Sequence, residues 1–258
     1  MENFFSLLPV EGVFSEPILW MLMMAIIMGG AFITSGFGVG GAVLTTPLFI
    51  MILPPKFAIG LLAPLNLFIN LAGVRQYWKN WNTHHLAVLL PAALIGVCVG
   101  SYLLATIPVS LVAKTVGVLA MVFGAFQFFT IRPEVRDRFR PNDWQGVCLG
   151  FASGITSALA HIGGVVFSFY LLPNSQDKES FVGTTVFMFT SMALLKIGTF
   201  SYYHLLTPSM FLLSLFLLPA SLLGAFAGKW LNRRISNRLF TRLISIMIAL
   251  MGLKLLLA

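Results

Sequence analysis

The chain has 258 residues, of which 58% are hydrophobic and only 9% are charged, and its mean hydropathy is +0.93. Soluble domains carry roughly 25% charged residues, so this composition excludes an ordinary water-facing surface and predicts an integral membrane protein. No charge-rich or Ser/Pro-rich block is long enough to form a separate soluble domain.

The formal net charge of +8 raises the alternative of nucleic-acid binding. The basic residues cluster in short gaps between apolar segments, which is the pattern that controls membrane topology. No signature of a nucleic-acid-binding fold accompanies them, so we expect no nucleic-acid partner. Cys98 and Cys148 lie in apolar stretches, and we interpret them as small buried hydrophobic residues rather than as a disulfide or metal site.

Apolar stretches near the membrane-crossing length of about 20 residues recur along the chain, separated by short polar gaps. In chain order they predict helices over 17–34, 43–53, 57–75, 86–105, 111–131, 144–160, 164–172, 181–201, 208–229 and 238–257. The second and seventh segments are too short to cross a bilayer upright, so they are half-helices or strongly tilted segments. The predicted fold is therefore all-α, with about ten membrane segments.

The distribution of positive charge predicts the orientation of these segments. Twelve of the sixteen basic residues fall in gaps, or in the segment ends that border them, on one side of the membrane: Arg75, Lys79, Arg132, Arg136, Arg138, Arg140, Lys178, Lys229, Arg233, Arg234, Arg238 and Arg242. Only Lys56 and Lys114 fall in gaps on the other side. The positive-inside rule then predicts a multi-pass protein of the cell (inner) membrane with both termini outside. This orientation holds whether the first two segments both cross the membrane or form a hairpin that dips to the midplane, because the parity is the same.

A glycine-rich stretch, Gly36-Phe-Gly-Val-Gly-Gly41, separates the first two segments. It is not a nucleotide-binding loop, because it follows an apolar helix and lacks the Lys-Ser/Thr pair of such loops. Two interpretations stay open. The glycines could let helices pack closely, or they could break a helix so that its exposed N–H groups and dipole bind an anion near the midplane.

The chain also resembles itself. "GGAVLTTPLFI" at Gly40 matches "GGVVFSFYLLP" at Gly163, and a further glycine follows at the same spacing in each copy. Later in each half, "LPAALIGVCVGSYL" matches "LPASLLGAFAGKWL". Repeats over 12–131 and 140–258 would hold five segments each, and an odd number requires the second to be inverted. Inverted repeats with short segments at matching positions are typical of secondary transporters with a midplane site at the repeat interface.

The break "GFGVGGAVLTTPL", its weaker second copy and the five-plus-five layout resemble the TauE/SafE family of sulfite exporters over essentially the whole chain. The resemblance implies transport of small sulfur-containing anions such as sulfite, thiosulfate or sulfoacetate. The second copy departs from the pattern: His161 precedes its glycine pair where the first copy has Gly38-Val39, and Tyr170 replaces Pro47. The two half-sites are therefore chemically unequal.

Titratable residues inside a membrane are candidates for function. His161 and Lys196 lie in apolar stretches, whereas no Asp or Glu lies within any predicted segment, so a cationic pair favours an anionic substrate. His161 could donate hydrogen bonds to an oxyanion or couple transport to protons, with a neutral histidine bonded to a carbonyl as the alternative. The alternative for Lys196 is that its ammonium extends to the membrane surface.

Neutral donors complete the set of candidate site residues. Asn66 and Asn70 are four residues apart and share one helical face, while hydroxyls in membrane helices often bond only their own backbone. The predicted substrate-binding residues are Gly38, Gly40, Gly41, Thr45, Asn66, Asn70, His161, Gly163, Gly164, Thr185, Thr190 and Lys196.

We therefore predict a secondary transporter, and more specifically an exporter, of small sulfur anions such as sulfite or sulfoacetate that works by alternating access. An anion channel and proton-coupled uptake of an anion such as thiosulfate stay open as alternatives. No catalytic or metal-ligating constellation is present, so we expect no enzyme activity and no cofactor. The expected partners are a small anion and the lipid bilayer, and a homodimer is one option for the oligomeric state.

Overall fold

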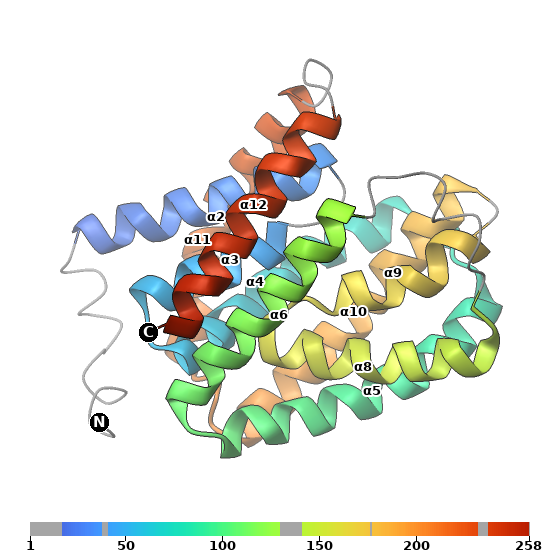
Figure 1. The fold of residues 1–258 in the computed structure, drawn as a ribbon, viewed down its shortest axis with the longest axis horizontal. Coiled ribbons are helices and arrows are strands. Elements are labelled where there is room, and N and C mark those ends of the chain that lie inside the picture. The colour runs from blue at the N-terminus through green and yellow to red at the C-terminus, as the bar shows by residue number, and fades with distance from the viewer. Residues whose placement is uncertain (1–16, 38–40, 130–140, 176, 232–236, 258) are drawn as a thin grey trace. The chain divides into compact units, whose positions relative to one another are not determined.

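The computed structural model describes residues 17–37, 41–129, 141–175, 177–231 and 237–257, and these residues form α-helices with no strand among them (Figure 1). The helices are α2 (Pro17–Phe37), α3 (Gly41–Ile52), α4 (Pro55–Gln76), α5 (Thr83–Thr106), α6 (Val109–Phe129), α8 (Asp143–Ala160), α9 (Gly163–Asn174), α10 (Lys178–Tyr202), α11 (Pro208–Leu231) and α12 (Asn237–Leu257). Each predicted segment corresponds to one of these helices, so the all-α prediction is confirmed.

Several helices begin earlier than hydropathy predicts, because polar residues cap them. The Asn82 side chain accepts a hydrogen bond from the His85 N–H at the start of α5, and Asp177 accepts one from the Ser180 N–H at the start of α10. At the start of α8, Asn142 and Gln145 form a reciprocal capping box. The first turns of α8 and α10 consequently contain Asp143 and Glu179, which lie outside the predicted segments.

Three of the described helices are long and apolar enough to cross a membrane by length and composition: Thr83–Thr106, Glu179–Tyr202 and Pro208–Gly228. Helices α3 and α9 have 12 residues each. At 1.5 Å per residue such a helix is about 18 Å long, whereas the hydrocarbon core of a bilayer is about 30 Å thick. Neither α3 nor α9 can therefore cross a membrane by itself, in agreement with the predicted short segments.

The chain divides into two compact units, and neither unit corresponds to one half of the sequence. Unit 1 contains residues 1–65, 108–128 and 204–258, and thus α2, α3, the first part of α4, α6, α11 and α12. Unit 2 contains residues 66–107 and 129–203, and thus the rest of α4 with α5, α8, α9 and α10. Each unit combines helices from before and after residue 131.

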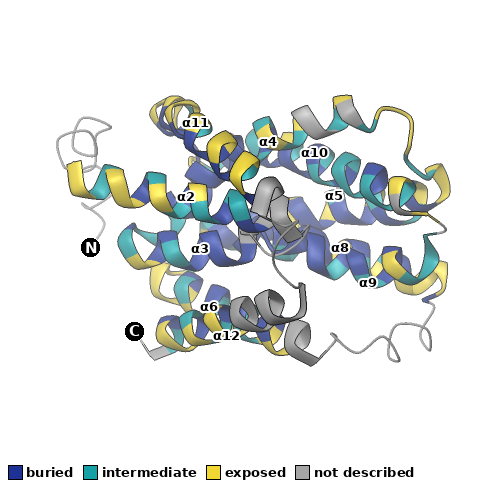
Figure 2. Ribbon diagram, turned by 90° about the horizontal axis from the view of Figure 1, so that it is seen from above, coloured by how far each residue is buried: buried dark blue, intermediate teal, exposed yellow. Residues whose placement is uncertain are grey.

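The core of unit 2 lies among α5, α9 and α10. It is built from Leu86, Leu89, Ala93 and Val97 of α5, Phe167, Tyr170 and Leu171 of α9, and Met188 and Met192 of α10. The buried residues of α5 recur every three to four positions, as expected for a helix with one packed face. In unit 1, α3 is almost entirely buried between Val43 and Ile50 (Figure 2).

Glycines allow two pairs of helices to touch at backbone distance. In unit 2, a Cβ added at Gly96 of α5 would overlap the Phe151 carbonyl oxygen of α8, and one at Gly154 of α8 would overlap the Ala93 carbonyl oxygen. Gly96 and Gly154 therefore serve close helix packing. Cys98 and Cys148 are both exposed, so the expectation that they are buried is wrong. Cys98 lies two residues after Gly96, and Cys148 lies two residues before Gly150, where an added Cβ would overlap the Leu89 carbonyl oxygen of α5. Two residues correspond to about 200° around a helix.

The same kind of contact occurs in unit 1. A Cβ added at Gly224 or Gly228 of α11 would overlap the carbonyl oxygen of Met28 or Phe32 in α2. In unit 2, Gly96 and Gly100 face Phe151 and Ile155. The α11 glycines are the repeat counterparts of the α5 glycines, and the sequence alignment that pairs Gly41 with Gly164 also pairs Met28 with Phe151 and Phe32 with Ile155. Residues at equivalent positions of the two repeats therefore make equivalent helix–helix contacts.

We expect Gly96→Ala and Gly154→Ala to destabilise unit 2 by about 1–3 kcal/mol each, because the added methyl group overlaps a backbone carbonyl of the facing helix. Gly198→Ala in α10 is the matched control, since nothing lies within 4 Å of a Cβ added there. Thermal unfolding of the purified protein in detergent measures the effect. Equal midpoints for all three variants would contradict the close α5–α8 contact.

Candidate functional site

The candidate site lies in unit 2, where α8 ends and α9 begins. Helix α8 ends at Ala160, and His161 follows it with a left-handed backbone conformation (φ 57°). This conformation is uncommon for residues other than glycine. The His161 N–H donates to the Ser157 carbonyl oxygen and the Ile162 N–H to the Thr156 carbonyl oxygen. The chain thereby turns within two residues and enters α9 at Gly163.

The first turn of α9 supplies part of the electrostatic field of this site. No side chain caps α9, because its N-cap residue is Ile162. The N-terminal end of a helix carries a partial positive charge from its aligned peptide dipoles, and this end favours a nearby anion. Gly163 and Gly164 are both buried, and so is His161, which precedes them.

Lys196 reaches this turn from α10. Its side chain is 4% exposed, so its ammonium does not extend to the membrane surface. The Nζ atom lies 3.3 Å from the Ser157 carbonyl oxygen, 3.2 Å from Ser157 Oγ and 3.1 Å from His161 Nδ1. Among the described residues, none of the partners of Lys196 is an acidic side chain.

Asn66 joins the same group from α4. Its Nδ2 atom lies 3.3 Å from His161 Nδ1, the atom that also faces Lys196. Asn66 and His161 are 95 residues apart and come from different halves of the sequence. We call Asn66, Ser157, His161 and Lys196 the lysine cluster. It combines a buried cation with an imidazole, an amide and a hydroxyl, and its neighbour is the start of α9.

Three of the predicted site residues therefore lie in the lysine cluster, namely Asn66, His161 and Lys196. Ser157, the fourth member, was not predicted. A serine inside an apolar helix is usually bonded to its own backbone, so its residue type gives little information. Its position four residues before His161 is the signal that could have identified it, since residues four apart along a helical segment lie near one another.

The remaining predicted residues have other surroundings. Gly163 packs against Ser153 and Ser157 of α8, and Gly164 packs against the Phe189 ring, so both serve close packing. The Thr190 hydroxyl donates to the Val186 carbonyl oxygen of its own helix. Thr185 Oγ1 is buried and makes no hydrogen bond to a described residue.

The predicted residues of the first half are described in part. Asn70 lies in unit 2, one helical turn after Asn66. Thr45 is a buried residue of α3 in unit 1, and α3 begins at Gly41. Gly38 and Gly40 lie outside the described residues.

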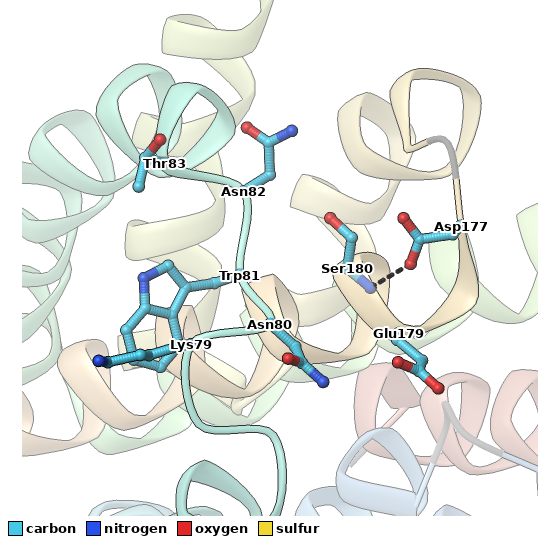
Figure 3. A pocket seen from close by; sticks show the side chains of 8 residues that line it. All are labelled: Lys79, Asn80, Trp81, Asn82, Thr83, Asp177, Glu179 and Ser180. Carbon is cyan, nitrogen blue, oxygen red and sulfur yellow. Dashed lines mark hydrogen bonds between the residues drawn. The ribbon is translucent and has the colours of Figure 1, made fainter.

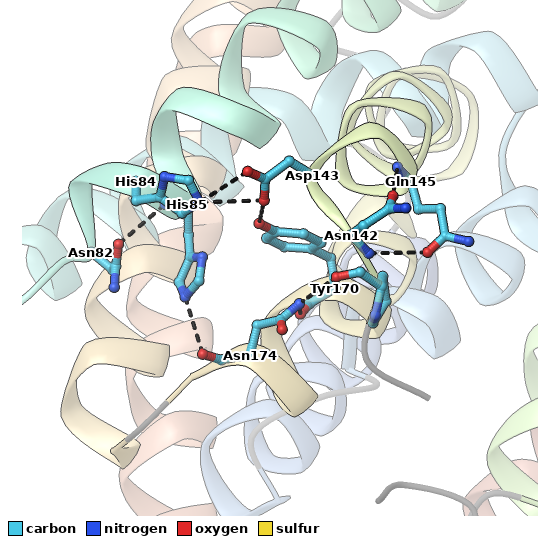
Figure 4. Close-up of polar contacts among 9 residues, drawn as sticks. Asn82, His84, His85, Asn142, Asp143, Gln145, Tyr170 and Asn174 are labelled. Atoms are coloured by element: carbon cyan, nitrogen blue, oxygen red, sulfur yellow. Dashed lines mark hydrogen bonds and ion pairs between the residues drawn. The ribbon is translucent and has the colours of Figure 1, made fainter. Parts of the chain in front are cut away.

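A second polar group in unit 2 connects the first turns of α5 and α8 with the end of α9 (Figure 4). Tyr170 donates a 2.8 Å hydrogen bond to Asp143, which also pairs with His84 at 3.2 Å. The His85 ring lies edge-on to Tyr170, and its Nε2 atom is 3.2 Å from the Asn174 carbonyl oxygen. The exposed His84–Asp143 pair contributes little stability. We interpret this group as a structural connection between helix ends.

A shallow pocket of about 580 Å³ lies between the residues that precede α5 and the start of α10 (Figure 3). Its lining combines one cation with two carboxylates and several neutral polar groups: Lys79, Asn80, Trp81, Asn82, Thr83, Asp177, Glu179 and Ser180. Asp177 is already engaged in capping α10. The two carboxylates disfavour an anion, so the lysine cluster is the better anion site of unit 2.

Comparison with known proteins adds a family to this geometry. No curated protein and no solved structure matches the chain. Residues 22–255 match the family described as "Sulfite exporter TauE/SafE", which is nearly the whole chain. The match supports a membrane transport role at the level of the family rather than an enzymatic one. The chain belongs to the TauE/SafE family of sulfite exporters.

Proposed function

We propose that this protein exports small sulfur-containing anions, such as sulfite or sulfoacetate, across the cell membrane, and that the lysine cluster receives the anion. The observation that carries this proposal is the buried Lys196 side chain, which is hydrogen-bonded but has no acidic partner among the described residues. Family membership supplies the chemical class of the substrate.

The electrostatics of the cluster favour an anion. A buried charge without a counter-charge is unfavourable in a protein interior, and in a membrane protein it marks a site of function. The dipole of α9 adds positive potential at the same place. An oxyanion bound there would neutralise Lys196 and accept hydrogen bonds from the surrounding donors, whereas a cationic substrate would meet only repulsion.

We further propose that transport works by alternating access of two inverted repeats, residues 12–131 and 140–258. The matching glycine contacts, of α5 with α8 and of α11 with α2, support a repeated architecture. The lysine cluster takes Asn66 from the first repeat and His161 with Lys196 from the second. A site with ligands from both repeats is what a transporter of this type requires.

The membrane potential would supply the driving force for export. In a cell whose interior is negative by about 100 mV, each negative charge that leaves gains roughly 2.3 kcal/mol. Export of an anion therefore needs no coupling ion, which agrees with the lack of acidic residues in the predicted membrane segments.

We expect purified protein in liposomes to move labelled sulfite or sulfoacetate, with saturation and with acceleration by an outside-positive voltage. Lys196→Met should raise the half-saturating concentration roughly 10- to 100-fold, because a hydrogen bond to a charged group is worth about 1.5–3 kcal/mol. Lys254→Gln in α12 is the control, since Lys254 is exposed.

Three outcomes of the flux measurement would contradict the proposal in different ways. Flux without saturation would indicate a channel. Unchanged affinity in Lys196→Met would remove the lysine cluster from the transport path. Failure of both anions to move, together with failure of either to raise the unfolding temperature, would refute the proposed substrates.

We also expect both termini on the outer side of the membrane and the arginine-rich segment 130–140 on the inner side. Alkaline phosphatase is active only outside the cell, and green fluorescent protein folds to its fluorescent form only inside. Phosphatase fusions at either terminus should therefore be active, and a fluorescent protein inserted at 130–140 should be bright. The opposite pattern would contradict the orientation that the basic residues predict.

A further inference from the structure

The surroundings of Lys196 indicate its charge state. Three acceptors lie within 3.3 Å of its Nζ atom: the Ser157 carbonyl oxygen, Ser157 Oγ and His161 Nδ1. An ammonium has three N–H donors and no acceptor, whereas a neutral amine has two N–H donors and a lone pair. Three acceptors match the three donors of the ammonium. The geometry therefore fits a charged Lys196.

His161 serves as one of these acceptors, and this role indicates its own protonation state. Its Nδ1 atom faces two donors, Lys196 Nζ at 3.1 Å and Asn66 Nδ2 at 3.3 Å. A ring nitrogen that accepts must carry a lone pair, so this arrangement holds the neutral imidazole with its proton on Nε2. A proton on Nδ1 would remove the third acceptor of Lys196 and place two cations side by side.

The other described titratable side chains of unit 2 lie away from Lys196 or are exposed. One set is the polar group of Figure 4, which comprises His84, His85, Asp143 and Tyr170. A second set is exposed or half-buried: Arg75, Tyr77, Lys79, Cys98, Tyr102, Cys148, Asp177, Glu179, Tyr202 and Tyr203. None of these side chains hydrogen-bonds or pairs with Lys196. Among the described residues of unit 2, His161 is therefore the titratable group that sets the charge beside Lys196, together with any bound anion.

We propose that a bound anion replaces His161 Nδ1 as the third acceptor of Lys196, and that His161 takes up one proton when that anion carries two negative charges. The inference rests on the proposed function, since it concerns the same site. An anion oxygen accepts from Lys196 Nζ, and the released Nδ1 binds a proton from solution, so that its N–H donates a hydrogen bond to the same anion. The proton dissociates when the anion leaves.

Charge decides which anions bring a proton with them. A monovalent anion such as methanesulfonate is balanced by Lys196, and a second positive charge on His161 would be unfavourable. A divalent anion such as sulfoacetate is balanced only when His161 is also protonated. One translocated sulfoacetate would then carry one net negative charge, so that both the membrane potential and a pH gradient would act on transport.

Isothermal titration in buffers of different ionisation enthalpy counts the protons taken up on binding. We expect about one proton per bound sulfoacetate in the wild-type protein near neutral pH, about none per methanesulfonate, and about none per sulfoacetate in His161→Asn. The affinity of the wild-type protein for sulfoacetate should fall as the pH rises, with a slope of about tenfold per pH unit that His161→Asn removes.

Asparagine is the appropriate substitution because it tolerates the left-handed conformation of His161 better than most residues do. His204→Asn is the matched control: His204 is also left-handed, with φ 56°, but it is exposed and belongs to unit 1. This control should keep the proton uptake and the pH slope of the wild-type protein.

The outcomes separate this inference from the proposed function. Binding of sulfoacetate without proton uptake, or with uptake that persists in His161→Asn, overturns the inference and leaves the anion site intact. Equal proton uptake with sulfoacetate and with methanesulfonate overturns the claim that the charge of the anion decides whether His161 is protonated. Failure of sulfoacetate to bind at any pH contradicts the proposed substrate and the linked proton together.

The unfolding temperature of the ligand-free protein tests whether Lys196 and His161 together carry a single positive charge when no anion is bound. Acidification forces a proton toward His161 beside the Lys196 ammonium, so the unfolding temperature of the wild-type protein should fall between about pH 7.5 and pH 5.5 more than that of His161→Asn. The difference between the two proteins is the relevant quantity, because all other titratable groups are shared. Parallel profiles would contradict the neutral state of His161 in the empty site.

Discussion

Burial of a lysine ammonium in an apolar helical protein is the constraint on which the arrangement of unit 2 depends. An isolated ammonium in such a place is strongly unfavourable. Its donors are satisfied by one short piece of chain, from Ser157 to His161, where α8 ends. The carbonyl oxygen and Oγ of Ser157 can face Lys196 together with His161 Nδ1 only because helix α8 stops and turns within that stretch. Together, the left-handed turn at His161 and the position of α10 place the hydrogen-bond acceptors around the Lys196 ammonium. The start of α9 follows directly from that turn.

The sequence predicts the helices well, because a membrane protein must show each buried helix as a long apolar run. It predicts their starts less well, since capping residues such as Asn82 and Asp177 are polar and hydropathy assigns them to loops. The exposure of Cys98 was missed for a related reason. Hydropathy is equally high on the packed face and on the outer face of such a helix, so it does not tell which face a residue occupies.

The site could be predicted only in part. His161 and Lys196 stand out because titratable residues are rare in apolar segments. Their contact depends on the packing of α8 against α10, and the approach of Asn66 bridges 95 residues of chain. No local pattern encodes such meetings. The repeat is a partial guide, yet it also misleads: in the alignment of the two halves, Gly38 and Gly73 stand where the second half has His161 and Lys196. Of the two similar halves of the sequence, only the second therefore has the titratable side chains of the site at these two positions.

The mixed origin of the two units also bears on how the protein is made. Helices leave the ribosome in chain order, but α2 packs through Met28 and Phe32 against α11, which lies near the other end of the chain. Unit 2 has all its helices once α10 has been synthesised, whereas α2 and α3 must wait for α11 and α12. During that interval the backbone surface of α2 that will receive Gly224 and Gly228 is without its partner. Division of the chain between α6 and α8 would leave neither fragment with a complete unit, so the two halves of the sequence depend on each other for folding.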